Sequence, residues 1–129
     1  MVAISSRVRA ELRRRVRGFG CAGRGIWIAT GQSNFRIHCL AAVVVACLAT
    51  AYGITGAHLG LVVTSVALVV AMEIMNTAVE RLCDFVAQLH GIGRDERIRD
   101  VKDLAAGAVL VVALGAAANG LIVFGPYLG

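Results

Sequence analysis

The chain has 129 residues, of which 58% are hydrophobic and only 16% are charged, and its formal net charge is +5. This length indicates one domain, residues 1–129. The composition is too apolar for an ordinary soluble domain, so it excludes most soluble enzyme classes and favours an all-α integral membrane protein.

The first segment, residues 1–25, is rich in arginine and amphipathic. Val8, Leu12 and Val16 recur at four-residue spacing, with Phe19 on the next turn of the same face. A helix of this kind lies on an anionic membrane surface with its apolar side in the lipid. A solvated basic tail is the alternative. No nucleic-acid partner is predicted, because the segment has no interleaved aromatic residues and no recognisable binding module.

The segment Gly18–Gly23 fits the pattern G-x-G-x-x-G. A dinucleotide site is not predicted, because no strand precedes these glycines and no βαβ unit fits in the chain. We expect the glycines to form a bend between the surface helix and the point where the chain enters the membrane.

Residues 37–72 contain no charged side chain. As one helix they would be about 54 Å long, which exceeds a hydrocarbon core of about 30 Å. The chain must therefore turn back once, and residues 52–56 are the only plausible break. The pattern predicts transmembrane helices at 37–53 and 58–86.

A third uncharged stretch predicts a transmembrane helix at 103–128, within which Asn119 is expected to donate a hydrogen bond to another helix. Gly56 and Gly60 form a GxxxG pair that would permit close helix packing. The four cysteines have no ligand-like spacing and are predicted to be free thiols.

The orientation follows from the basic residues. Residues 1–36 and the loop 87–102 contain every Lys and Arg except Arg81, whereas the turn 53–58 contains none. By the positive-inside rule, the N-terminus and the loop 87–102 are cytoplasmic and the C-terminus is outside.

Four polar residues lie on one face of the second predicted transmembrane helix. At about 100° per residue, Asn76, Glu80 and Asp84 fall at about −60°, −20° and +20° from Glu73. Glu73 would be about 9 Å inside the cytoplasmic boundary, with Glu80 near the interface and Asp84 just beyond it. Such a polar stripe inside a membrane is a candidate functional site by default.

Lys102 and Asp103 stand at the start of the third transmembrane helix, at about the level of Glu80. Together with the stripe they indicate phosphoryl transfer from a nucleotide to a lipid hydroxyl. Glu73 would accept the proton, and Asn76 would hold the substrate or orient the base. Glu80 and Asp103 are suited to Mg²⁺, and Lys102 to phosphate charge.

Two alternatives stay open. An intramembrane Glu also pairs with Arg or His on a neighbouring helix, or relays protons in a transporter. A non-catalytic protein, either a proton-coupled carrier or a degenerate kinase, is therefore the competing hypothesis.

Two separated motifs in the sequence resemble those of the prokaryotic diacylglycerol kinase family. Residues 73–84 are similar to its signature E-x-x-N-[ST]-A-[IV]-E-x-x-x-D, and residues 102–109 to its segment K-D-x-x-[AS]-x-A-V. Residues 19–26 and 34–38 also match. The resemblance covers residues 16–128.

The resemblance implies a homotrimer in the bacterial cytoplasmic membrane, with three transmembrane helices and a surface helix per subunit, that uses ATP and Mg²⁺ at sites shared between subunits. By resemblance, Glu73 is the catalytic base and Asn76 a neighbouring site residue. Glu80 is a metal ligand, and Lys102 and Asp103 serve the nucleotide phosphates and the metal. Arg14 corresponds to a further basic residue of the nucleotide site.

One position departs from the family pattern. Gln32 stands where the family often has a second metal-binding Glu, and an amide oxygen is a weaker Mg²⁺ ligand than a carboxylate. This departure keeps the degenerate kinase open. The lipid is open as well: Asn34, Arg36 and His38 resemble the undecaprenol kinase branch, but diacylglycerol stays the alternative acceptor.

Overall fold

The computed structural model describes residues 2–91 and 93–127, with side chains from Val8 onward. It contains four α-helices: α1 (Val2–Ala29), α2 (Ser33–Ala51), α3 (Gly56–Leu89) and α4 (Glu96–Phe124). A short 3₁₀-helix, η1 (Gly125–Tyr127), follows. The described residues form no strand, so the predicted all-α class is confirmed.

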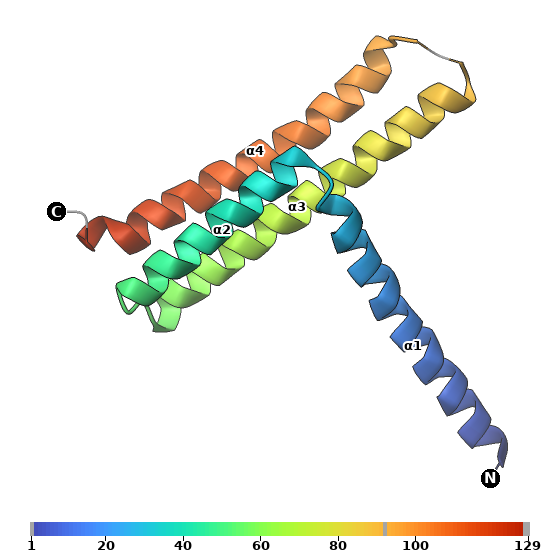
Figure 1. Cartoon of the computed structure of the whole chain (residues 1–129), viewed down its shortest axis with the longest axis horizontal. Helices are drawn as coiled ribbons and strands as arrows, with labels where there is room; N and C mark the ends of the chain where they lie inside the picture. Colours follow the sequence, from blue (N-terminus) through green and yellow to red (C-terminus); the bar gives the residue numbers. More distant parts are fainter. Residues whose placement is uncertain (1, 92, 128–129) are drawn as a thin grey trace.

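Three of these helices are long and apolar enough to cross a membrane, namely α2, α3 and α4 with its continuation into η1. They run side by side, with α3 antiparallel to both α2 and α4 and in contact with both (Figure 1). The three predicted membrane-crossing helices are therefore confirmed. Because α3 carries the polar stripe, its central place in the bundle puts that stripe within reach of both neighbouring helices.

The helix α1 leads away from this bundle and touches it only near its own C-terminal end (Figure 1). Its apolar face is uncovered by the described chain: Val8, Leu12, Val16 and Phe19 are all exposed. An uncovered apolar stripe on a basic helix is what membrane-surface binding requires. That binding stays a prediction.

The prediction of a bend at Gly18–Gly23 is wrong, because α1 continues through these glycines to Ala29. The chain turns instead at residues 30–32. There the N–H of Gly31 bonds to the carbonyl of Ile28 at 3.3 Å, and the N–H of Gln32 to that of Ala29 at 2.9 Å. Such i→i+3 bonds tighten and end a helix, whereas single glycines only weaken one.

The turn between α2 and α3 falls within the predicted break. Gly53 and Gly56 have φ of 65° and 59°, a conformation that glycine adopts without steric cost. Between them Ile54 folds inward and packs with Ala49, Val62 and the end of α4. A Cβ built on Gly56 or Gly60 would meet nothing within 4 Å, so no part of the described chain packs closely on the GxxxG pair.

The loop between α3 and α4 is shorter than the predicted 87–102, because α3 continues to Leu89 and α4 begins at Glu96. Asp95 starts α4: its Oδ1 accepts a hydrogen bond of 2.8 Å from the N–H of Arg97. An aspartate at this position satisfies an N–H group that the helix leaves free. The charged residues that follow therefore form a helix start.

Two smaller predictions are confirmed. Asn119 on α4 donates a hydrogen bond of 3.0 Å from Nδ2 to Oγ of Ser65 on α3. All four cysteines are free thiols. Between the membrane-crossing helices this hydrogen bond joins polar groups that would otherwise be costly in an apolar environment.

Candidate active site

The polar stripe of α3 begins with a buried carboxylate. Glu73 is only 3% exposed although it lies within a helix apolar enough to cross a membrane. Burying a carboxylate there is costly, so the surrounding groups must compensate for it or use it. Glu73, the residue of the predicted stripe that is costliest to bury, is therefore buried in the structure.

Asn76, the next residue of the stripe, is 4% exposed and donates a hydrogen bond of 3.0 Å from Nδ2 to Oε1 of Glu80. The amide therefore orients Glu80 in this structure. Its other atom, Oδ1, is buried and has no hydrogen-bond partner among the described residues. A buried acceptor without a partner costs free energy, so this oxygen is available to a donor from a ligand.

Thr77 is a residue that the sequence reasoning missed. It is 4% exposed, and its Oγ1 also has no hydrogen-bond partner among the described residues. The signal was its spacing, because residues four apart in a helix share a face and Thr77 is four after Glu73. Two buried polar atoms without partners therefore lie next to the buried carboxylate.

At the far end of the stripe, Asp84 joins α3 to α4. Its Oδ1 accepts a hydrogen bond of 2.6 Å from Nζ of Lys102. The structure therefore brings Lys102 to the stripe. This agrees with the predicted depth of Lys102 in the membrane, at about the level of Glu80. Asp103, in contrast, pairs with Arg99 of its own helix at 3.6 Å, and its side chain is 67% exposed.

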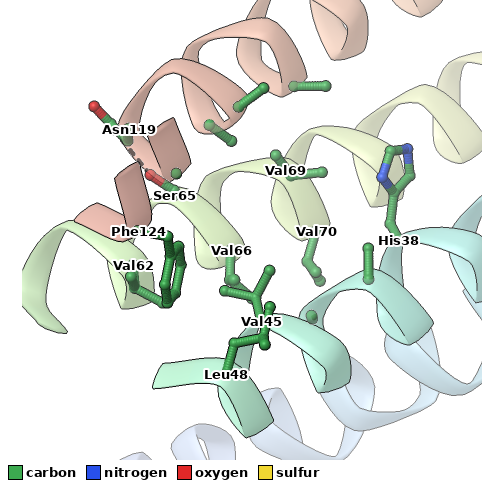
Figure 2. A pocket seen from close by; sticks show the side chains of 16 residues that line it. His38, Val45, Leu48, Val62, Ser65, Val66, Val69, Val70, Asn119 and Phe124 are labelled. Carbon is green, nitrogen blue, oxygen red and sulfur yellow. Dashed lines mark hydrogen bonds between the residues drawn. The ribbon is translucent and has the colours of Figure 1, made fainter. Parts of the chain in front are cut away.

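His38 on α2 was named from the sequence only for its resemblance to the undecaprenol kinase branch, and its place at the site was not predicted. It is half-buried and faces the gap between α2 and α3 (Figure 2). The imidazole and the carboxylate of Glu80 are both near enough to Glu73 to interact with it electrostatically. Sequence periodicity did not reveal this neighbour because it comes from another helix.

Among the described residues, no side-chain hydrogen bond or ion pair joins the other two predicted site residues to this cluster. Gln32 is half-buried at the N-cap position of α2, where its side chain makes no capping hydrogen bond. Arg14 is exposed in the middle of α1, which leads away from the bundle (Figure 1). The roles of both residues stay predictions.

No group of three His, Cys, Asp or Glu side chains suited to a metal ion occurs within the described part of the chain. Mg²⁺ used with a nucleotide does not require such a group, because that ion is commonly bound by one or two carboxylates, phosphate oxygens and water. Glu80, half-buried and already oriented by Asn76, is a carboxylate of the right kind.

Three helices apolar enough to cross a membrane enclose a buried carboxylate, and a second carboxylate and a lysine lie toward the α3–α4 loop, so the fold and the site define the class of an integral membrane protein with a polar site inside its helical bundle. Its family is established by comparison with known proteins.

Residues 20–124 match the family described as prokaryotic diacylglycerol kinase. The chain is 32% identical over 121 residues to undecaprenol kinase of Bacillus subtilis (strain 168), which covers 93% of this chain and 95% of that protein. It is 34% identical over 98 residues to a diacylglycerol kinase of Synechocystis, covering 76% of this chain and 54% of that protein. The chain belongs to the prokaryotic diacylglycerol kinase family.

The family resemblance drawn from the two motifs is thereby confirmed. The chain is a lipid kinase of a prokaryotic family, and its reaction uses a nucleotide phosphate donor. These relatives favour a kinase over the proton-coupled carrier.

Proposed function

We propose that this chain is a homotrimeric enzyme of the bacterial cytoplasmic membrane that transfers the γ-phosphate of ATP to the hydroxyl of undecaprenol or diacylglycerol. One observation carries the proposal: Glu73 is 3% exposed and lies on the same helix face as the hydrogen-bonded pair Asn76–Glu80. A proton acceptor at membrane depth thus lies next to a carboxylate that is closer to the water.

In the proposed reaction Glu73 accepts the proton of the lipid hydroxyl while the oxygen of that hydroxyl forms a bond to the γ-phosphorus. The bond between the γ-phosphorus and the bridging oxygen breaks, and ADP leaves with that oxygen. A positioned base of this kind typically contributes about 10²–10⁴-fold to the rate. The buried Oδ1 of Asn76, which has no partner among the described residues, is a suitable acceptor for a substrate donor.

Toward the cytoplasm, Glu80 and Asp103 would hold Mg²⁺, with Gln32 as a weaker third ligand. When bound, the ion would neutralise charge on the phosphates. Asn76 keeps the Glu80 carboxylate oriented through its hydrogen bond of 3.0 Å. Asp103 would have to exchange its exposed contact with Arg99 for the metal, which costs little because surface ion pairs are weak.

Lys102 would bind the nucleotide phosphates, and Arg14 would add charge from α1. In the structure Asp84 holds Lys102 at 2.6 Å from its carboxylate. Because Lys102 is one-third exposed, a triphosphate arriving from the cytoplasm has access to it. Its ammonium group provides a compact positive charge for this purpose.

Between the two acceptors, undecaprenol has the better support. The relative covered over 95% of its length bears the name undecaprenol kinase. The segment containing Asn34, Arg36 and His38 resembles that branch. An assay of the purified protein with MgATP and each lipid in parallel distinguishes the two acceptors.

The base is tested by Glu73→Gln, which keeps the shape of the side chain and removes its ability to accept a proton. We expect phosphoryl transfer to fall by about 100-fold or more. The oligomer should stay intact, as checked by measuring its mass in detergent. Radiolabelled phosphate from ATP appearing in the lipid is the readout.

The matched control is Glu96→Gln, because Glu96 is exposed in the first turn of α4. This variant should keep wild-type turnover. Equal turnover by Glu73→Gln and wild type would remove Glu73 as the base. A wild-type protein that phosphorylates neither lipid would overturn the proposed function.

A further inference from the structure

Thr77 on α3 differs from Thr30 and Thr50 in what its hydroxyl binds. Thr30 Oγ1 donates a hydrogen bond of 2.6 Å to the carbonyl of Trp27. Thr50 Oγ1 donates one of 2.8 Å to the carbonyl of Ala46. These two side chains are exposed, whereas Thr77 is 4% exposed and its Oγ1 has no partner among the described residues. The bond to its own helix, which threonine commonly makes, is therefore missing where burial makes it most needed.

The hydroxyl of Thr77 also finds no other donor or acceptor nearby in the described chain. A buried polar group without a partner costs free energy, because folding has removed the water that would bond to it. Such groups are uncommon in folded proteins, and a catalytic role is one of the few reasons to keep one. A hydroxyl has one hydrogen to donate and lone pairs to accept with, so an incoming ligand oxygen would satisfy it.

Thr77 lies between the two carboxylates to which the proposed reaction assigns roles. By helical spacing it is about 40° from Glu73 and about 60° from Glu80 around the axis of α3. Along the axis it is about 6 Å from Glu73 and about 4.5 Å from Glu80. In the proposed reaction the lipid oxygen is at Glu73 and Mg²⁺ is at Glu80. The phosphorus passes between them, at the level of Thr77.

The chemistry of a hydroxyl suits this position. The transferred phosphoryl group has negative charge spread over the three oxygens around its phosphorus. A hydrogen-bond donor that is already in place in a water-excluded site stabilises such charge strongly. A hydroxyl is also neutral, so it adds no charge to the membrane-crossing bundle when the nucleotide is absent. The partnerless atom of Asn76, Oδ1, can only accept a hydrogen bond and would repel a phosphate oxygen.

We propose that Thr77 is a further catalytic residue, whose Oγ1 donates a hydrogen bond to an oxygen of the phosphoryl group while that group passes to the lipid. Thr77 keeps its own proton, and no covalent bond to it forms or breaks. The proton of the lipid hydroxyl goes to Glu73, and the bridging oxygen leaves with ADP. This inference rests on the proposed function, because the proposed base and metal ligand define where the phosphoryl group lies.

The test is Thr77→Val, which keeps the branched shape of the side chain and removes its hydroxyl. We expect kcat for phosphoryl transfer to fall by about 100-fold, an effect typical of losing one such donor. The KM values for MgATP and for the lipid should stay within about twofold of wild type, because the lost bond acts mainly in the transition state. Thr77→Ser keeps the hydroxyl and should retain kcat to within about fivefold of wild type.

The melting temperature separates this role from a structural one. If the hydroxyl of Thr77 held the bundle together, Thr77→Val would lower the Tm of the unliganded protein. Replacing a partnerless buried polar group by an apolar group of the same shape is instead nearly neutral or stabilising. We therefore expect the Tm of Thr77→Val to equal or exceed that of wild type, with the same oligomer mass in detergent.

Thr64→Val is the matched control, because Thr64 lies on the same helix and is exposed. It should leave kcat, both KM values and the Tm unchanged. If Thr77→Val fails to assemble, Thr77→Cys takes its place. A thiol is only a weak hydrogen-bond donor, so this variant should also lose most of kcat.

A second measurement needs no turnover. Aluminium fluoride added with MgADP takes the place of the transferred phosphoryl group, and its binding raises the Tm. Beyond the effect of MgADP alone, it should raise the Tm of wild type, Thr77→Ser and Thr64→Val. In Thr77→Val this additional rise should be less than about half as large. MgADP alone should give the same shift in every variant, because Thr77 does not contact the ADP.

The outcomes distinguish this inference from the proposed function. Should wild type transfer phosphate to neither lipid, the proposed function fails, and the additional rise with aluminium fluoride alone decides the role of Thr77. A Thr77→Val variant that matches wild type in kcat or in that rise would overturn the inference. So would an equal loss of kcat in Thr77→Ser, a lowered Tm of unliganded Thr77→Val, or the absence of any additional rise in wild type.

Discussion

Exposure of the polar side chains along α3 increases from Glu73 toward the α3–α4 loop. Glu73 and Asn76 are 3% and 4% exposed, Glu80 is half-buried, and the side chain of Asp84 is 58% exposed. These four residues span about 16 Å of helix. In the proposed reaction, a lipid alcohol would meet the buried end of the series, and a soluble triphosphate would meet the exposed end.

The proposed role of Glu80 as a metal ligand is tested by removing its side chain. Glu80→Ala removes the carboxylate that Asn76 orients. If Glu80 binds Mg²⁺, the Mg²⁺ concentration for half-maximal transfer should rise by about tenfold or more. The measurement is a titration of activity with Mg²⁺ at fixed ATP.

Glu11→Ala is the control for that titration. Glu11 is an exposed carboxylate on α1 that pairs with Arg15 at 3.6 Å. Its removal should not change the Mg²⁺ curve. An unchanged curve for Glu80→Ala as well would remove Glu80 from the list of ligands.

At single residues, sequence reasoning succeeded where one helix determines the answer. Glu73, Asn76 and Glu80 share a face because of helical spacing alone, which the sequence states directly. His38 and the pairing of Asp84 with Lys102 depend on how helices approach one another. Helical periodicity contains no information about that approach. The place of His38 was therefore not predicted, and for Lys102 the sequence predicted only that it lies at about the same membrane depth as the stripe.

Among the elements, α4 begins with a cap that depends on charge. The guanidinium of Arg97 and the backbone N–H of Arg97 both hydrogen-bond to the Asp95 carboxylate, and they hold the pKa of Asp95 below its usual range. A carboxylate with a lowered pKa in the folded state stabilises that state while ionised. This stabilisation is complete above the unfolded pKa of about 3.9 and is lost as the pH falls through the folded value.

We therefore expect the first turn of α4 to open more readily as the pH falls below about 4. Hydrogen exchange at the amide of Arg97, expressed as a protection factor, reports this opening. Asp95→Ala should lose protection several-fold at neutral pH already, because the cap acceptor is gone.

Asp95→Asn separates charge from capping. Asparagine also caps helices but does not titrate. Its protection factor should therefore stay constant through the same pH range. A pH-dependent loss in Asp95→Asn equal to that of wild type would assign the effect to another group.

The helix ends also show what an element's own sequence specifies. Gly53 and Gly56 occupy positions with positive φ, so a glycine-rich break at 52–56 was readable in advance. The glycines of α1 have helical geometry, and the chain turns at residues 30–32 instead. Glycine permits a turn without requiring one, and the tertiary structure decides which glycines are used.

For the whole molecule, the outer faces of α2, α3 and α4 are strongly apolar. Val43, Leu68 and Leu110, one from each helix, are all more than half exposed. In a membrane such faces meet lipid or the helices of other subunits. This is compatible with the homotrimer implied by resemblance, but a helix face that meets lipid has the same composition as one that meets another subunit. Neither the sequence nor one chain therefore determines the number of subunits.

The reaction also requires one orientation of the whole bundle. The end that carries Glu80, Asp84 and Lys102 must face the cytoplasm, where the nucleotide is, and the turn between α2 and α3 must face outside. Two exposed residues report the two ends: Arg94 in the α3–α4 loop and Thr55 in the α2–α3 turn. Thr55 makes no side-chain capping bond, so replacing it should cost little.

In a variant without the native cysteines, a membrane-impermeant maleimide added to spheroplasts should label Thr55→Cys and leave Arg94→Cys unlabelled. After permeabilisation both should react, which controls for reactivity. The physical reason is the distribution of Lys and Arg, which the membrane keeps on the cytoplasmic side. Labelling of Arg94→Cys alone in sealed spheroplasts would place the lysine and the exposed carboxylates on the side without ATP, and the proposed transfer would then be impossible for this bundle.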